Sequence, residues 1–405
     1  MTSGPLWAAE SCRYEQRQFR YLFERVDRPV PAGAEIVTAY TDGTVTLRRN
    51  RRVEGYHEAA SLDGFKGVAR GDFVVHGLDI LRGSIGVSDS EGAISAVCVT
   101  SRPRPGLEPR FFAYALRAQA WSGYTRAFAR GVREGGADFR RWSTLGDLRL
   151  PAPSTEIQRA VADFLDAETT RIDALVIRKR RLLSLISLRR RAAIGEAINS
   201  TGGEELPLRR VIEAFIDYRG ATPEKVAAGV PLVTATNVAD GEIDFSLGEQ
   251  FVSEETYAEW MRRGLPEAGD VLLTTEAPLG EVAMIDEPRI ALAQRIILLK
   301  PDRRRVEPEF LYASLRSPQV QADLLSRASG STVWGIRADR LRDVRLHVPH
   351  LIDQRRIVTT SQRLQQEYQR ARGLLRVQVD LLRERRQALI TAAVTGQIDV
   401  AKAAG

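Results

Sequence analysis

The 405-residue chain contains few cysteines, histidines and lysines, and it has no long apolar run. Its two cysteines, Cys12 and Cys98, are far apart in sequence, which is typical of buried thiols in a reducing cytosol and not of a disulfide framework. No stretch approaches the roughly 20 uninterrupted apolar residues that a membrane-spanning helix requires. The N-terminus lacks the basic and apolar regions of a secretion signal. These absences predict a cytoplasmic protein.

Motifs of catalytic and cofactor-binding sites are also missing. Neither Gly-x-Gly-x-x-Gly nor a phosphate loop ending in Gly-Lys-Ser/Thr occurs, which argues against a nucleotide-dependent enzyme. No serine lies in a nucleophile-elbow motif. His347 and His350 are close in sequence, but no cysteine or carboxylate cluster joins them at metal-ligand spacing. We therefore expect a binding protein without catalytic residues, metal or cofactor of its own.

Arginine supplies nearly all of the positive charge. Basic residues number 59 against 52 acidic ones, and only five are lysine. The planar guanidinium suits bidentate contacts to phosphate and to guanine, and a positive field favours polyanionic partners. A genomic codon bias would produce the same excess, so composition alone leaves both interpretations open.

The sequence contains an internal duplication. Gly71-Asp72 recurs as Gly269-Asp270, Glu108-Pro109 as Glu307-Pro308, and Thr201-Gly202 as Thr395-Gly396. The order is conserved and the separation stays near 200 residues, so one structural unit is present twice. Two copies are too few for a solenoid, which needs at least about three repeats. A molecule with pseudo-twofold symmetry is the better prediction.

Each copy is predicted to be a mixed α/β unit followed by a long helix. Asp42-Gly43 between two strand-like segments is a hairpin signal, and Pro109 and Pro308 suit the first turn of a helix. Expected strands cover residues 35–40, 44–48, 73–76 and 93–100, and then 230–234, 270–275, 282–285 and 292–299. Short helices are expected at residues 19–24 and 208–213. The helices that begin at Pro109 and Pro308 are each followed by a second predicted helix, at residues 118–128 in the first copy and 319–327 in the second.

The two long helices carry apolar stripes. The first runs from Thr155 to Asn199, and Thr155 and Gln158 have the spacing of a capping box. The second follows Pro349. At about 1.5 Å per residue the first is about 65 Å long and needs a partner of similar length. An antiparallel coiled coil within the chain is favoured over pairing between molecules or packing along one unit. The predicted packing residues are Ile172, Leu175, Leu182, Ile186, Tyr368, Leu375, Leu382 and Leu389.

These elements predict four segments. Residues 1–153 form the first mixed unit, residues 154–203 the first long helix, residues 204–349 the second unit, and residues 350–405 the second long helix with a C-terminal tail.

Polar side chains in the predicted loops are candidates for nucleic-acid binding. Arginine and short hydroxyl side chains on glycine-containing loops reach phosphates and base edges. A solvated surface is the alternative for each group alone, but similar groups recur at matching places in both copies. The candidates are Arg48, Arg49, Arg51, Arg52, His76, Arg82, Arg126, Arg130, Arg133, Arg140 and Arg141 in the first copy, and Thr275, Arg327, Ser329, Ser331, Thr332, Trp334 and Arg337 in the second.

The segments before the long helices are the most specific motifs. They read LGDLRLPAPSTEIQ from Leu145 and LRDVRLHVPHLIDQ from Leu341. Both resemble the Leu/Pro-rich segment, ending in an acidic residue and glutamine, of the specificity subunits of Type I restriction–modification systems. Gly220-Ala221-Thr222-Pro223 resembles the opening of a target-recognition domain in that family, and residues 272–282 resemble its strand–loop–strand core. The first copy departs from the pattern, with Arg28-Pro29-Val30-Pro31 near the place of Gly-x-Thr-Pro.

The resemblance implies an α+β fold. Two similar mixed α/β target-recognition domains would be joined by two long helices packed as an antiparallel coiled coil, in a pseudo-twofold internal repeat. Each domain would read one half of a bipartite target in double-stranded DNA, while the helices set the gap and dock two adenine methyltransferase subunits. The methyltransferase subunits and the restriction/translocase subunits would bind S-adenosylmethionine, ATP and Mg. This chain itself would be non-catalytic.

Two other functions are considered. A fused methyltransferase–nuclease would carry a cofactor-binding glycine motif and an Asn/Asp-Pro-Pro-aromatic loop, and neither occurs. A basic coiled-coil scaffold without sequence-specific DNA reading is the remaining alternative.

Overall fold

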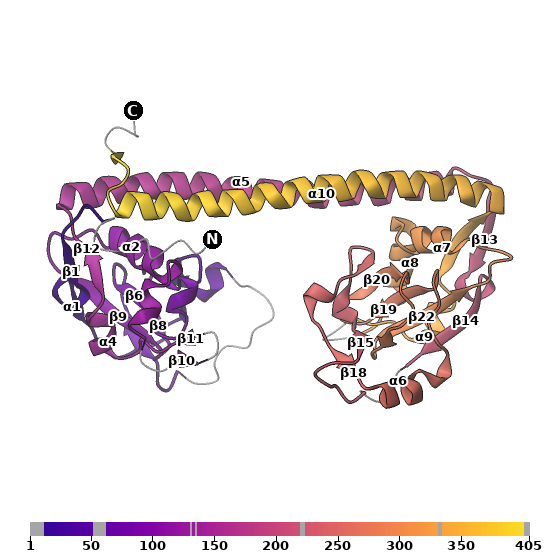
Figure 1. Ribbon diagram of the computed structural model, residues 1–405, viewed down its shortest axis with the longest axis horizontal. Helices are drawn as coiled ribbons and strands as arrows, with labels where there is room; N and C mark the ends of the chain where they lie inside the picture. The colour runs from indigo at the N-terminus through magenta and orange to yellow at the C-terminus, as the bar shows by residue number, and fades with distance from the viewer. Residues whose placement is uncertain are drawn as a thin grey trace. The chain divides into compact units, whose positions relative to one another are not determined.

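The computed structural model (Figure 1) describes residues 12–51, 62–129, 132–133, 136–218, 223–330 and 334–400, with only the backbone at 132–133 and 136–137. It contains two compact units. Unit 1 comprises residues 1–178 and 377–405, and unit 2 comprises residues 179–376. Each is described by itself.

Both units contain a four-stranded antiparallel sheet with the same strand order. In unit 1 the order is β2 (Phe23–Arg25), β9 (Cys98–Pro103), β6 (Phe73–His76) and β7 (Ile85–Val87). In unit 2 it is β14 (Ile212–Asp217), β22 (Ile296–Pro301), β19 (Val271–Thr275) and β20 (Leu279–Met284). The register is also shared, since Val74 pairs with Thr100 and Leu272 pairs with Leu298. The predicted duplication and fold class are confirmed.

Short paired strands surround each sheet. In unit 1 they are β1 (Gln16–Gln18) with β12 (Arg149–Pro151), β3 (Val37–Ala39) with β4 (Val45–Leu47), β5 (Lys66–Val68) with β8 (Gly92–Ile94), and β10 (Val132–Arg133) with β11 (Gly136–Ala137). In unit 2 they are β13 (Gly203–Pro207) with β23 (Arg345–Pro349), β15 (Val230–Val233) with β18 (Phe251–Val252) and β21 (Ala291–Leu292), and β16 (Val238–Ala239) with β17 (Glu242–Ile243). The predicted hairpin at Asp42-Gly43 is formed by β3 and β4.

The shorter helices follow a similar order in the two units. Unit 1 has α1 (Phe19–Leu22), α2 (Pro109–Trp121), α3 (Tyr124–Ala127) and α4 (Trp142–Gly146), with 3-10 turns at Arg48–Asn50 and Ile80–Arg82. Unit 2 has α6 (Glu254–Trp260), α7 (Pro308–Leu315), α8 (Pro318–Arg327) and α9 (Ala338–Leu341), with 3-10 turns at Leu208–Arg210, Ala235–Asn237, Phe245–Leu247 and Met261–Arg263. The predicted helix starts at Pro109 and Pro308 are confirmed.

The cores of the units differ in composition. In unit 1, Phe23 of the sheet lies 4.6 Å from Phe73 and 5.5 Å from Phe112 of α2, measured between ring centroids. In unit 2 the matching core is mainly aliphatic, with Val271 and Leu273 on one face of β19 and Leu272 in a second core on the other face. This division follows from the alternation of side chains along a strand.

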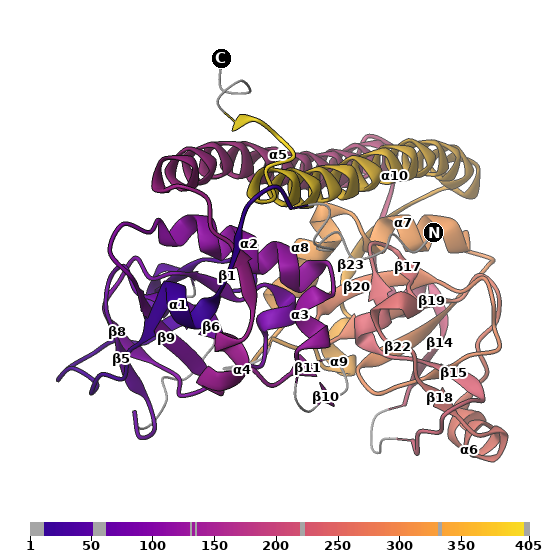
Figure 2. The same ribbon diagram turned by 60° about the vertical axis from the view of Figure 1, so that its left-hand side comes forward.

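The long helices are α5 (Thr155–Asn199) and α10 (Leu351–Val394). Within each unit they lie side by side and run in opposite directions (Figures 1 and 2). In unit 1, Arg386 of α10 pairs with Asp173 of α5 at 3.2 Å. In unit 2, the Arg190 guanidinium of α5 lies 4.2 Å from the centroid of the Tyr368 ring of α10. The predicted antiparallel coiled coil is confirmed.

The predicted packing residues of these helices are buried to different degrees. Ile172 and Tyr368 are buried, and Ile186, Leu375, Leu382 and Leu389 are half-buried. Leu175 and Leu182 keep 38% and 47% of their surface exposed, so much of each side chain remains available to other molecules. In the described part of the chain, no helix is long and apolar enough to cross a membrane.

A buried glutamine replaces the predicted capping box at the start of α5. The Thr155 hydroxyl donates to the carbonyl of Gly106 and not to its own helix. The Gln158 amide donates to the Pro153 carbonyl at 2.8 Å, and its oxygen accepts from the Glu108 amide at 2.9 Å. Gln354 of α10 makes the same two contacts, to the Pro349 carbonyl and the Glu307 amide, at 2.8 and 2.9 Å. Each glutamine thereby joins a long helix to the start of α2 or α7.

Other boundary predictions were wrong. Residues 93–100 and 292–299 each contain two strands, because the chain turns at Ser95, whose carbonyl accepts from Cys98, and at Arg295, whose φ is 72°. Residues 118–128 contain the end of α2 and then α3, separated by a turn at Gly123. The helices expected at 19–24 and 208–213 are single turns followed by strands. A continuous apolar run does not reveal where a buried chain changes direction.

Candidate nucleic-acid interface

The same backbone junction occurs in both units at the end of a central strand. In unit 1 the Gly77 amide donates to the Val97 carbonyl at 2.9 Å, and the Gly77 carbonyl accepts from the Phe139 amide at 2.8 Å. In unit 2 the Thr275 amide donates to Arg295 at 2.8 Å, and the Thr275 carbonyl accepts from Ile336 at 3.0 Å. We call each of these three-segment contacts a strand-end junction.

Close backbone packing requires glycine at the first junction. A Cβ atom on Gly77 would lie 2.7 Å from Cγ and 2.8 Å from the backbone nitrogen of Arg140. Phe139 beside it is fully buried and anchors the segment that carries Arg140. The junction therefore holds residues 139–141 against the end of β6.

The side chains of the first junction are mainly basic. Arg140 binds the Asp138 carboxylate through two nitrogens, at 3.0 and 2.8 Å. Arg140 lowers the pKa of Asp138 to about 2, so this carboxylate stays charged and orients the guanidinium. Arg141 follows as an exposed side chain. The His76 ring accepts from the Asp79 amide at 3.0 Å, which makes it part of the turn that carries the exposed Arg82.

The second junction presents an aromatic ring and two arginines. Trp334 is 60% exposed. Arg337 lies 3.3 Å from Asp339 and its side chain is 73% exposed. Ser329 joins the junction through two backbone hydrogen bonds with Gly335, at 2.9 and 3.1 Å. Exposed aromatic and arginine side chains are suited to stacking and to phosphate or base contacts.

Some predicted residues contribute differently or lie elsewhere. Thr275 is 4% exposed and takes part through its backbone. Arg327 is held by Asp323 at 3.0 Å. Arg49 and Arg51 pair with Glu35 and Asp42 at 2.8 and 2.6 Å, around the β3–β4 hairpin.

The remaining candidates are easily placed. Arg48 lies in the turn after β4, and Arg126 is exposed on α3. Arg133 is described by its backbone alone, in β10. Arg52, Arg130, Ser331 and Thr332 lie outside the described residues.

Two junction residues were missed by the sequence interpretation. The Arg295 guanidinium lies 3.8 Å from the Glu276 carboxylate, and both side chains are substantially exposed. A signal was available, because Gln294-Arg295 interrupts the apolar run of residues 290–299. Among the described residues, no group of three or more His, Cys, Asp or Glu could hold a metal ion.

Comparison with known proteins relates the chain to one family. Residues 262–372, which include the second junction, match the model of the Type I restriction modification DNA specificity domain. The chain is similar to specificity subunits of Type I restriction enzymes. The specificity subunit of the Type I restriction enzyme EcoBI from Escherichia coli is 20% identical over 297 residues, which are 66% of this chain and 61% of that subunit. This chain therefore matches about three fifths of the length of that relative.

Two further proteins are similar to this chain. The specificity subunit of the Type I restriction enzyme MjaIX from Methanocaldococcus jannaschii is 29% identical over 146 residues, 35% of this chain and 33% of that subunit. A chain of a solved type I R-M system shares the fold, with a TM-score of 0.64 and 16% identity over 95% of this chain and 98% of its own length. The fold of that chain thus extends over nearly the whole of this one.

Proposed function

We propose that this specificity subunit reads a bipartite target in double-stranded DNA, one half with each unit. The observation that carries the proposal is the pair of strand-end junctions. Their backbone hydrogen bonds are equivalent, whereas the exposed side chains differ, with Arg140 and Arg141 in one and Trp334, Arg337 and Arg295 in the other. A shared frame with different side chains suits two readers of different half-sites.

The domain boundaries follow the same proposal. Target-recognition domain 1 occupies residues 1–153 and target-recognition domain 2 residues 204–349. Residues 154–203 and 350–405 form the helical spacer, which sets the number of base pairs between the half-sites. The chain performs no catalysis itself.

The spacer helices also dock the methyltransferase subunits in this proposal. Support comes from large apolar side chains that the coiled coil leaves exposed. On the unit 1 part, Ile177 is 65% and Leu381 57% exposed, and on the unit 2 part, Leu188 is 61% and Leu374 67% exposed. Exposed apolar residues in such numbers are typical of protein-binding surfaces. Two adenine methyltransferase subunits and the restriction subunits would bring S-adenosylmethionine, ATP and Mg.

Selection from random DNA duplexes tests the reading function. The purified chain, or its complex with methyltransferase subunits, is incubated with the duplexes, and the bound fraction is sequenced. We expect enrichment of two short conserved blocks separated by a fixed gap. The absence of enrichment would contradict sequence reading and favour a scaffold.

Variants at one junction assign the half-sites. Replacing Arg337 with alanine should relax the preference in one block by about 1–3 kcal/mol at the affected base pair and leave the other block unchanged. Arg304→Ala is the matched control, because this side chain is 87% exposed in the turn before α7 and pairs with Asp302. Equal loss in both blocks would contradict the assignment of one unit to each half-site.

A further inference from the structure

The two units place a buried arginine at the same position. Arg117 of α2 lies under the Asp42-Gly43 turn, and Arg316 lies under Asp240-Gly241. A Cβ atom on Gly43 or on Gly241 would come within 2.3 Å of the guanidinium below it. A second arginine approaches each one from a long helix, Arg386 in unit 1 and Arg190 in unit 2. Both units therefore contain the same arrangement of two arginines, one under a turn and one on a long helix.

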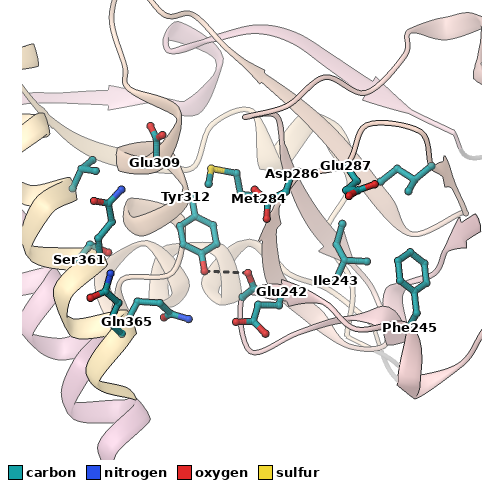
Figure 3. Close-up of a pocket in the computed structure, with 15 residues that line it drawn as sticks. Glu242, Ile243, Phe245, Met284, Asp286, Glu287, Glu309, Tyr312, Ser361 and Gln365 are labelled. Carbon is teal, nitrogen blue, oxygen red and sulfur yellow. Dashed lines mark hydrogen bonds between the residues drawn. The ribbon is translucent and has the colours of Figure 1, made fainter. Parts of the chain in front are cut away.

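In unit 2 a tyrosine satisfies the buried arginine. Arg316 donates to the Asp240 carbonyl at 2.8 Å and to the Tyr312 hydroxyl, which itself donates to the Gly241 carbonyl at 3.0 Å. The space that Arg316 and Arg190 line has a volume of only about 10 Å³. The larger cavity of this unit, about 700 Å³, is lined by Tyr312 and not by Arg316 (Figure 3). Tyr312 therefore covers the arginine and completes its hydrogen bonds.

In unit 1 the corresponding residue is Ala113, four residues before Arg117 just as Tyr312 is four before Arg316. Because no phenol covers it, Arg117 itself lines a cavity of about 550 Å³, together with Ala113 and Arg386. Arg117 is 5% exposed, and its Nε finds no hydrogen-bond partner in the described part of the chain. A buried guanidinium with an unmatched donor is unfavourable unless an acceptor occupies the space beside it.

Three of the four aspartates that line this cavity are already held by other cations, and the carboxylate of the fourth, Asp89, accepts from the Ser90 hydroxyl. Asp42 binds Arg51 at 2.6 Å, Asp166 binds Arg110 at 2.6 Å, and Asp173 binds Arg386 at 3.2 Å. Burial and the neighbouring Arg386 lower the pKa of Arg117 to about 10, which still leaves it charged at neutral pH. Thr44, Ser88 and Thr169 also line the cavity. The Ser88 hydroxyl already donates to the Ser90 carbonyl at 2.6 Å, and the Thr169 hydroxyl lies 3.2 Å from that of Tyr114. The unmatched group of this environment is therefore the buried cation Arg117.

We propose that the cavity between α2 and the long helices of unit 1 binds a small free oxyanion of phosphate size, which accepts hydrogen bonds from Arg117. Oxyanions accept several charge-assisted hydrogen bonds from guanidinium groups. The site is separate from the strand-end junction of the same unit, because α4 and β11 lie on the side of unit 1 away from α5 (Figures 1 and 2). In unit 2 the larger cavity does not reach Arg316, because Tyr312 covers this arginine and accepts its hydrogen bond.

Titration of the full chain with inorganic phosphate at constant ionic strength tests the site. We expect saturable binding of one phosphate per chain and a rise in the thermal unfolding midpoint as the site fills. Ala113→Tyr should lower the affinity at least tenfold, since it rebuilds the arrangement of unit 2 while keeping Arg117. Tyr312→Ala should open a second site in unit 2. Weak binding of phosphate to surface arginines is the same in all variants, so it does not affect the difference in affinity between them.

Three results would overturn the proposal. These are the absence of saturable binding, an affinity unchanged in Ala113→Tyr, and displacement of the phosphate by duplex DNA, which would make a DNA phosphate the occupant. Arg117→Met should also abolish binding. If that variant does not fold, Ala113→Tyr and Tyr312→Ala still decide the question, because the first covers a buried arginine and the second uncovers one.

Discussion

At the scale of single residues, two buried glutamines attach the long helices to the mixed units. Gln158 and Gln354 are 1% and 0% exposed, and each spans from the proline-containing segment before its helix to the backbone amide of the N-cap residue of α2 or α7. Loss of either amide would leave buried backbone groups without partners. The Leu/Pro-rich motif therefore has a mechanical role, which is to hold the start of each long helix against its own unit.

Replacing Gln158 or Gln354 with alanine should reduce the free energy of unfolding by about 1–3 kcal/mol, because a buried backbone donor and acceptor lose their partner. Urea denaturation measures this loss. Gln387→Ala, at an exposed position of α10, is the control and should have little effect. An equal, negligible effect at all three positions would show that the buried amides do not stabilise the helix starts.

Cysteine reactivity provides a pH-dependent prediction. Burial raises the pKa of Cys98 to about 12, so its thiol stays protonated in the folded chain, whereas an unfolded thiol ionises near pH 8.5. This group contributes stability that is fully present below about pH 8.5 and is lost as the pH rises toward 12. Cys98→Ala should remove that part of the alkaline decrease in stability.

A thiol reagent checks the same assignment. At pH 8 we expect Cys12, which is half-buried, to react in the folded chain, and Cys98 to react only after denaturation. Rapid modification of both cysteines under native conditions would contradict the burial of Cys98.

At the scale of elements, the strand-end junction shows how one frame carries different side chains. The same two hydrogen bonds connect β6 or β19 to two other loops, although the residues involved differ almost completely. Backbone bonding leaves the side chains free to vary, so different sets of exposed groups are compatible with one fold. The arrangement suits a repeated domain whose copies bind different sequences.

The long helices provide a test of the spacer. Removing residues 178–184 together with the equivalent residues 374–380 deletes one heptad from each helix and preserves the apolar stripes. Each helix becomes about 10 Å shorter, so we expect a gap reduced by roughly three base pairs at about 3.4 Å per step and unchanged half-sites. Selection from random duplexes measures both.

The control deletes a heptad from α5 alone, which breaks the match between the helices and should reduce stability. A double deletion that folds but keeps the original gap would contradict the spacer role.

At the scale of the whole molecule, the chain is basic although several of the candidate arginines are paired with carboxylates. Arg49, Arg51, Arg140 and Arg337 each have a carboxylate partner, although they were predicted to be available to DNA. Exposed ion pairs of this kind are weak and exchange readily for phosphate contacts. The net charge of +7 nevertheless favours a polyanion as partner.

DNA binding should therefore weaken steeply with salt. If about 6–10 phosphates are neutralised, affinity falls by about 10³–10⁵ between 50 and 200 mM salt. Fluorescence anisotropy with a labelled duplex that contains the selected target measures the slope. A nearly flat profile would show that phosphate contacts contribute little.

The duplication, the long helices and most of the strands were predictable from the amino-acid sequence. These features depend on local signals, namely apolar periodicity, proline and glycine positions, and motifs repeated at a constant separation. Such signals can be read from the sequence without knowing which residues are in contact in the folded chain. The candidate site was found only in outline, since Arg140, Trp334 and Arg337 were predicted but Glu276 and Arg295 were not.

Which groups far apart in the chain meet in space became visible in the folded molecule. The pairing of Arg51 with Asp42, the burial of Thr275 and the turn at Arg295 depend on contacts between segments that the sequence does not place together. The contrast between Ala113 and Tyr312 is visible in the sequence, but it acquires meaning from the buried arginine that lies beside each of them. Contacts in space between residues far apart in the chain set these properties, and no local pattern encodes them.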